Sequence, residues 1–223
     1  MNHPSLVPTY PEWVRPIFDH PVSDPAWHWD LEADTTEPPA PTCVAYLTQL
    51  FTNPKPILAR YTDAQLNQGF WYLVSNACSN YMFTLLEPEV VWPARQAALR
   101  AITNLFAQLF ANRCSPHLSH LDERGANSLN SVCYMWWDLF PTWGQPESST
   151  QTVVDGEVLG VMQRVLALNS LACQESALHG LGHWQGRYPG VVEETIDIYL
   201  KRELELEPRL RQYALSARTG CVL

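Results

Sequence analysis

Hydrophobic residues recur along most of the chain with the period of an α-helix. From Thr42 onward, apolar side chains return every three or four positions, in segments delimited by prolines and glycines. No segment shows the apolar–polar alternation of a half-buried strand. The pattern predicts an all-α fold, an irregular stack of antiparallel helix hairpins. Helices are expected near residues 42–53, 62–86 (with a break near 75–79), 93–112, 129–140, 158–169, 171–186, 189–202 and 208–220.

The first forty residues do not share this pattern. Half of the 18 prolines lie between Pro4 and Pro41, and proline at this density prevents a long helix. Aromatic residues are nevertheless frequent there, which a solvated linker would not need. We therefore expect residues 1–40 to form a proline-rich arm that packs on the helical body, with a short helix around 11–19.

The helical remainder divides into an N-terminal part, 41–143, and a C-terminal part, 155–223. Residues 141–152 combine proline, glycine, serine and threonine, which is typical of a connecting loop. A chain of 223 residues is long enough to bury one large core. We therefore expect the two parts to form one continuous domain.

Composition narrows the classes of partner. The net charge is −9, from 14 basic and 23 acidic residues. Nucleic acids and anionic membranes attract clustered Lys and Arg, so the charge argues against both and favours a basic protein. The sequence shows no signal peptide and no apolar run that could span a bilayer, and its six cysteines form no CxxC pair. These features predict a cytoplasmic protein without a cofactor.

Residues 171–186, LACQESALHGLGHWQG, predict one helix with two unlike faces. Cys173, Ala177, Gly180 and Trp184 recur at helical spacing and share one face. Three of these four side chains are small. This face should let a neighbouring helix approach closely.

The second face carries Glu175, His179 and His183 at steps of four. Two histidines at this spacing can place both imidazoles on one metal ion, with a third ligand supplied from the 113–126 segment, by His117, His120 or Asp122. The plainer interpretation is that Glu175 pairs with His179 and that His183 covers Trp184 or caps the turn before Gly186. The sequence favours the plainer interpretation and leaves a metal site of Glu175, His179 and His183 as the alternative.

The C-terminal third resembles a known family of helical repeats. The segments SALHGLGHW (176–184), PGVVEETIDIYL (189–200) and EPRLRQYALSARTG (207–220) are similar to HEAT-like repeats. The resemblance implies an α-solenoid, or α–α superhelix, and a role as an interaction scaffold. The histidines are not part of the HEAT pattern.

A helical stack offers a concave groove, and tryptophan is enriched where proteins bind one another. Trp136 and Trp137 diverge by one helical step, so we expect one in the core and the other partly exposed. We predict a non-enzymatic protein-interaction module, immunity- or scaffold-like, whose partner is a basic protein or a second copy of the chain. The alternative is a metal-dependent hydrolase centred on His179 and His183. The expected binding residues are Trp136, Trp137, His179, His183, Trp184 and Arg187.

Overall fold

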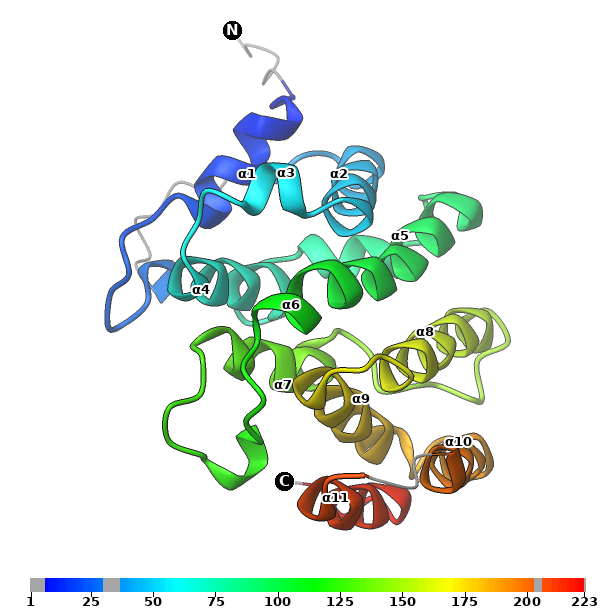
Figure 1. Ribbon diagram of the computed structural model, residues 1–223. Helices are drawn as coiled ribbons and strands as arrows, with labels where there is room; N and C mark the ends of the chain where they lie inside the picture. Colours follow the sequence, from blue (N-terminus) through cyan, green and yellow to red (C-terminus); the bar gives the residue numbers. More distant parts are fainter. Residues whose placement is uncertain (1–6, 30–36, 203–205, 223) are drawn as a thin grey trace, which may run out of the picture.

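The computed structural model describes residues 7–29, 37–202 and 206–222. Throughout these ranges the regular structure is helical, as the hydrophobic period predicts (Figure 1). The α-helices are α1 (Tyr10–Phe18), α2 (Ala40–Thr52), α3 (Lys55–Leu58), α4 (Asp63–Val74), α5 (Trp92–Leu105), α6 (Ala111–Arg113), α7 (Leu129–Leu139), α8 (Gln151–Leu166), α9 (Leu171–Trp184), α10 (Pro189–Arg202) and α11 (Pro208–Arg218). Shorter turns are η1 (Trp27–Trp29), η2 (Tyr81–Leu85), the π-helical η3 (Phe106–Phe110) and η4 (Ser119–Leu121).

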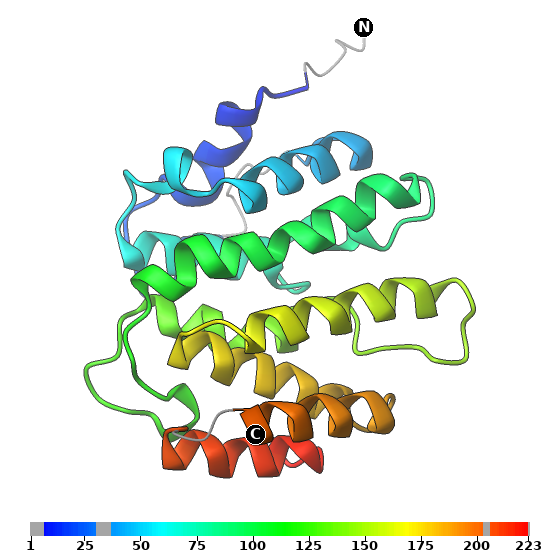
Figure 2. The same cartoon turned by 45° about the vertical axis from the view of Figure 1, so that its right-hand side comes forward.

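The helices form two rows that run side by side from the N-terminal to the C-terminal end (Figures 1 and 2). In one row α4 packs between α1 and α7, and α9 packs between α7 and α11. In the other row α5 packs between α2 and α8. Helix α10 packs against α9 and α11. This arrangement confirms the predicted stack of helix hairpins, and it places α9 in contact with four other helices.

Local sequence explains most of the helix boundaries. The Thr62 hydroxyl accepts a hydrogen bond from the backbone N–H of Gln65, while Thr62 N–H donates to the Gln65 side chain, and this capping box starts α4. The break expected near 75–79 is present, because α4 ends at Val74. The helix predicted over 93–112 is also present, as α5, η3 and α6 in succession.

Helix α8 begins seven residues earlier than the hydrophobic pattern predicted. The Ser148 hydroxyl accepts a hydrogen bond from Gln151 N–H at the start of the helix. The buried Asp155 carboxylate accepts hydrogen bonds from Gln145 N–H (2.6 Å) and from the Tyr188 hydroxyl (2.6 Å). These contacts extend α8 into the connecting loop expected over residues 141–152. The hydrophobic pattern could not predict them, because they join polar groups.

The N-terminal arm contacts the body through α1. The side chains of Trp13, Ile17 and Phe18 are buried. A Cβ atom at Gly69 of α4 would lie 2.7 Å from the Ile17 carbonyl oxygen, so only glycine lets the two helices approach this closely. Residues 1–6 and 30–36 of the predicted arm lie outside the described residues.

Among the described helices, none combines the length and the apolar composition needed to cross a membrane.

Candidate functional site

Both predicted faces of α9 lie against other elements of the protein. The small-residue face packs on α7: a Cβ atom at Gly180 would lie 2.6 Å from both Cβ and Cγ of Trp137. This confirms that α9 uses a glycine to approach a neighbouring helix. The polar face lies toward the C-terminal end of α7, toward η4 and toward α11.

The structure corrects the prediction for the tryptophans. Trp136, Trp137 and Trp184 have no exposed surface in the described structure. The ring of Trp136 packs among four phenylalanine rings, and Trp137 stacks on Phe106 beneath α9. Because α7 lies between α4 and α9, both of its diverging faces are core faces. These three rings therefore present no surface to a partner in this conformation.

Two exposed residues lie at the same end of the molecule. Trp143 follows α7 and is 54% exposed, and its ring lies nearly parallel to that of His183, with centroids 6.2 Å apart. Arg187, one of the predicted binding residues, is exposed in the turn after α9. Its participation in binding stays a prediction.

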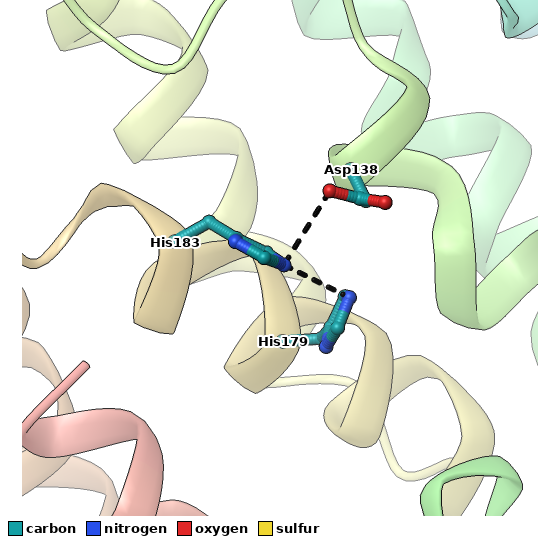
Figure 3. Close-up of side chains that lie close together, drawn as sticks. All are labelled: Asp138, His179 and His183. Atoms are coloured by element: carbon teal, nitrogen blue, oxygen red, sulfur yellow. Dashed lines mark hydrogen bonds and ion pairs between the residues drawn. The ribbon is translucent and has the colours of Figure 1, made fainter. Parts of the chain in front are cut away.

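The two predicted histidines meet a carboxylate that the sequence pattern did not indicate. His179 and His183, one helical turn apart on α9, and Asp138, near the end of α7, point toward a common space (Figure 3). The two Nε2 atoms are 3.2 Å apart, and His183 Nε2 lies 3.5 Å from Asp138 Oδ1. One potential ligand atom from each of the three residues lies within 4.8 Å of the corresponding atoms of the other two. Asp138, His179 and His183 are hereafter called the His–His–Asp cluster.

These separations match those between the ligands of a tetrahedral metal ion. With metal–ligand bonds of roughly 2.0–2.1 Å, neighbouring ligand atoms on a tetrahedral ion lie about 3.3 Å apart. The two separations from His183 Nε2, 3.2 Å and 3.5 Å, bracket that value. The third separation, between the Asp138 carboxylate and His179, is at most 4.8 Å, and the Asp138 side chain is 29% exposed. The cluster therefore requires little rearrangement to hold an ion.

The protonation state of His179 suits a ligand. The residue is almost fully buried. Burial, together with the nearby His183 and His120 side chains, lowers the pKa of His179 to about 3. The imidazole is therefore neutral at physiological pH, which metal ligation requires. Its other nitrogen, Nδ1, lies 2.7 Å from the Tyr213 hydroxyl, which leaves Nε2 facing the cluster.

Glu175 belongs to a different set of contacts, which corrects both interpretations of it. Its buried carboxylate accepts hydrogen bonds from the backbone N–H groups of Ser119 and His120 (2.9 Å each), and it contacts His120 Nδ1 at 2.6 Å. Glu175 thus neither pairs with His179 nor joins the His–His–Asp cluster. The segment around η4 folds onto the N-terminal half of α9 and hydrogen-bonds to the Glu175 carboxylate.

The expected third ligands also lie outside the cluster. His117 Nδ1 contacts the Ser115 hydroxyl, and His120 contacts Glu175. Asp122, in a left-handed backbone conformation, ends η4. The third residue is instead Asp138, whose only sequence signal is that it follows two tryptophans near the end of an amphipathic segment. That signal does not indicate which neighbouring helix the carboxylate meets.

Comparison of the chain with protein-family models, with curated proteins and with solved structures found no match. Its function is therefore inferred from its own side chains.

Proposed function

We propose that the protein binds one divalent transition-metal ion, of the zinc type, through Asp138, His179 and His183. The observation that carries this proposal is the spacing of the ligand atoms, 3.2 Å and 3.5 Å, close to the edge of a tetrahedral site. Two imidazoles and a carboxylate are ligands that zinc commonly takes in proteins. In this proposal the ion replaces the proton that the two Nε2 atoms share in the metal-free protein.

Three protein ligands leave a fourth coordination position for water, as in catalytic rather than structural zinc sites. The side chains of His183 and Asp138 are 28% and 29% exposed, so solvent can reach that position. A zinc-bound water has a pKa of about 7 and can act as a nucleophile. We therefore propose hydrolysis as the class of chemistry.

Metal titration of the purified protein tests the site. After chelator treatment, we expect one Co²⁺ per chain with the visible absorption of tetrahedral coordination, displaced by one Zn²⁺. Asp138→Asn and His183→Gln each remove a ligand at a partly exposed position. We expect each to weaken Zn²⁺ binding by about 100-fold or more, beyond the usual effect of changing an outer-shell residue.

His117→Gln is the matched control. It removes one of the histidines expected as a third ligand, which in the structure contacts Ser115 instead. We expect it to bind Zn²⁺ like the wild type. Wild-type protein that takes up no Co²⁺, or equal losses in His117→Gln and His183→Gln, would contradict the proposed site.

A second proposal is that the chain is a HEAT-like protein-interaction module for a basic partner. The stacking of α9 on α8, α10 and α11, together with the net charge of −9, supports it. Trp143, which is not one of the expected binding residues, is largely exposed, at 54%. Its exposed ring, next to His183, replaces the three buried tryptophans as the expected contact.

Two exposed tryptophans make a controlled test of this second proposal possible. Trp143→Ala should abolish capture of a basic protein from host lysate, because the ring would supply the central apolar contact. Trp29→Ala removes a ring of similar exposure, 58%, from the N-terminal arm and should leave capture unchanged. Capture that survives Trp143→Ala would contradict this role for Trp143.

A further inference from the structure

Tyr213 of α11 lies where three segments of the chain meet behind the His–His–Asp cluster. Its hydroxyl is 2.7 Å from His179 Nδ1 and 3.1 Å from the Tyr134 hydroxyl of α7. Its ring stacks on His120 of η4, with centroids 4.0 Å apart and planes 18° apart. The side chain is therefore fixed at its polar end and on one ring face.

The contact with Tyr213 engages Nδ1 of His179 and leaves Nε2 as the nitrogen that faces the cluster. When His179 Nδ1–H donates to the Tyr213 oxygen, Nε2 carries the lone pair and faces His183 and Asp138. The Tyr213 O–H can then donate to the Tyr134 oxygen, so the buried Tyr213 hydroxyl both accepts and donates a hydrogen bond. The opposite tautomer would place the proton on Nε2 and block ligation.

The position of Tyr213 depends on a second buried contact. His120, which stacks on the tyrosine ring, is held by Glu175 through its backbone N–H and its Nδ1 atom. Glu175 lies one helical turn before His179 on α9. The polar face of α9 thus uses His179 and His183 for the cluster and Glu175 to hold the residue that supports Tyr213.

We infer that Tyr213 is a positioning residue for the metal: it fixes the ring orientation and the tautomer of His179, and the Glu175–His120 pair holds Tyr213 in place. The inference rests on the proposed metal site. It assigns functions to α11 and to η4, neither of which supplies a ligand. Outer-shell partners of this kind typically change metal affinity by 10–100-fold when they are removed.

Tyr213→Phe tests the inference, since it keeps the ring and removes only the hydroxyl. We expect Zn²⁺ affinity, measured by competition with a chromophoric chelator, to fall by about 10–100-fold. We also expect the visible bands of the Co²⁺ complex to shift, because the His179 ring is no longer held. Tyr46→Phe is the matched control: it removes a part-buried hydroxyl of α2 that donates to the Pro8 carbonyl oxygen, leaves the Tyr213–His179 contact intact, and should bind like the wild type.

A second measurement begins with the wild-type protein. In the wild-type Co²⁺ complex, proton NMR should show one slowly exchanging, strongly shifted N–H signal. This signal would come from His179 Nδ1–H, which is buried and hydrogen-bonded, whereas His183 is reached by solvent. In Tyr213→Phe the same proton should exchange faster.

The possible results separate this inference from the proposed function. Wild-type protein without Co²⁺ uptake would overturn both. Normal uptake with no slowly exchanging N–H signal would overturn only the positioning role, as would a Tyr213→Phe variant with unchanged affinity and spectrum. An equal loss of affinity in Tyr46→Phe would also overturn it, because the effect would then not depend on the Tyr213–His179 contact.

Discussion

At the scale of single residues, Gly180 shows how a side chain that is absent determines the packing of its neighbours. The backbone of α9 approaches Trp137 so closely that a Cβ atom would lie 2.6 Å from its Cβ and Cγ atoms. The Trp137 Cβ is tied directly to the backbone of α7. A rotation of the side chain therefore cannot relieve the overlap, and the two helices would have to separate.

Gly180→Ala is therefore expected to destabilise the protein by about 1–3 kcal/mol, the usual cost of overpacking. This loss should occur even though alanine favours a helix over glycine by about 1 kcal/mol. The measurement is the free energy of unfolding in urea.

Gly156→Ala in α8 is the matched control, because nothing lies within 4 Å of the Cβ it would add. With no overlap, only the helix propensity remains, and we expect a stabilisation of about 0.5–1 kcal/mol. Effects of the same sign in both variants would contradict this account of the α7–α9 contact.

At the scale of helices, Glu157 connects α8 to α5. Its carboxylate lies 2.9 Å from Arg100, 3.1 Å from Arg164 and 3.0 Å from the side-chain amide of Gln96. Burial alone would raise the pKa of Glu157. The hydrogen bonds from Arg100, Gln96 and Arg164 outweigh that effect, and the net result is a lowered pKa.

Glu157→Gln should consequently lower the free energy of unfolding near neutral pH by about 1 kcal/mol, a modest value because both arginines are largely exposed. The pKa of Glu157 is lowered in the folded state. The contribution is therefore present above pH about 4.5 and is lost as the pH falls through the folded-state pKa.

Urea unfolding at several pH values measures the difference between wild type and variant, which should shrink toward acid pH. Glu194→Gln, a change at an exposed acid on α10, should show no comparable difference. A difference between wild type and Glu157→Gln that stays constant down to acid pH would contradict the ionic contribution.

At the scale of the whole molecule, the two rows share one hydrophobic core. Buried residues from Trp13 in α1 to Ala217 in α11 belong to a single cluster. Helices α5 and α7 each contact elements of both the N-terminal part, 41–143, and the C-terminal part, 155–223. Separating the two parts would expose the interior faces of both helices.

Unfolding is accordingly expected to be one cooperative transition. Circular dichroism reports all the helices, and fluorescence reports the buried tryptophans in α1, α7 and α9. The two signals should give the same midpoint in urea. Two separate midpoints would show that the parts fold independently, on either side of residues 141–150.

The sequence by itself determined the fold class and most helix boundaries. Both depend on local causes: the apolar period, proline in the first turn and capping at Thr62. It also identified the small-residue face of α9. It identified the two histidines of the cluster, which lie one helical turn apart on that helix. Residues three or four apart on a helix share a face whatever surrounds them.

The tertiary structure alone decided what each face meets. α9 contacts four other helices, so both of its faces lie against protein and only the His183 end of the polar face is reached by solvent. Trp136 and Trp137 are both buried because α7 has neighbours on both sides. Asp138 reaches His183, and His120 reaches Glu175, through approaches between segments distant in sequence. The helical period fixes the direction of a side chain relative to its own axis, whereas the rotation and contact of two helices depend on the packing of the entire core.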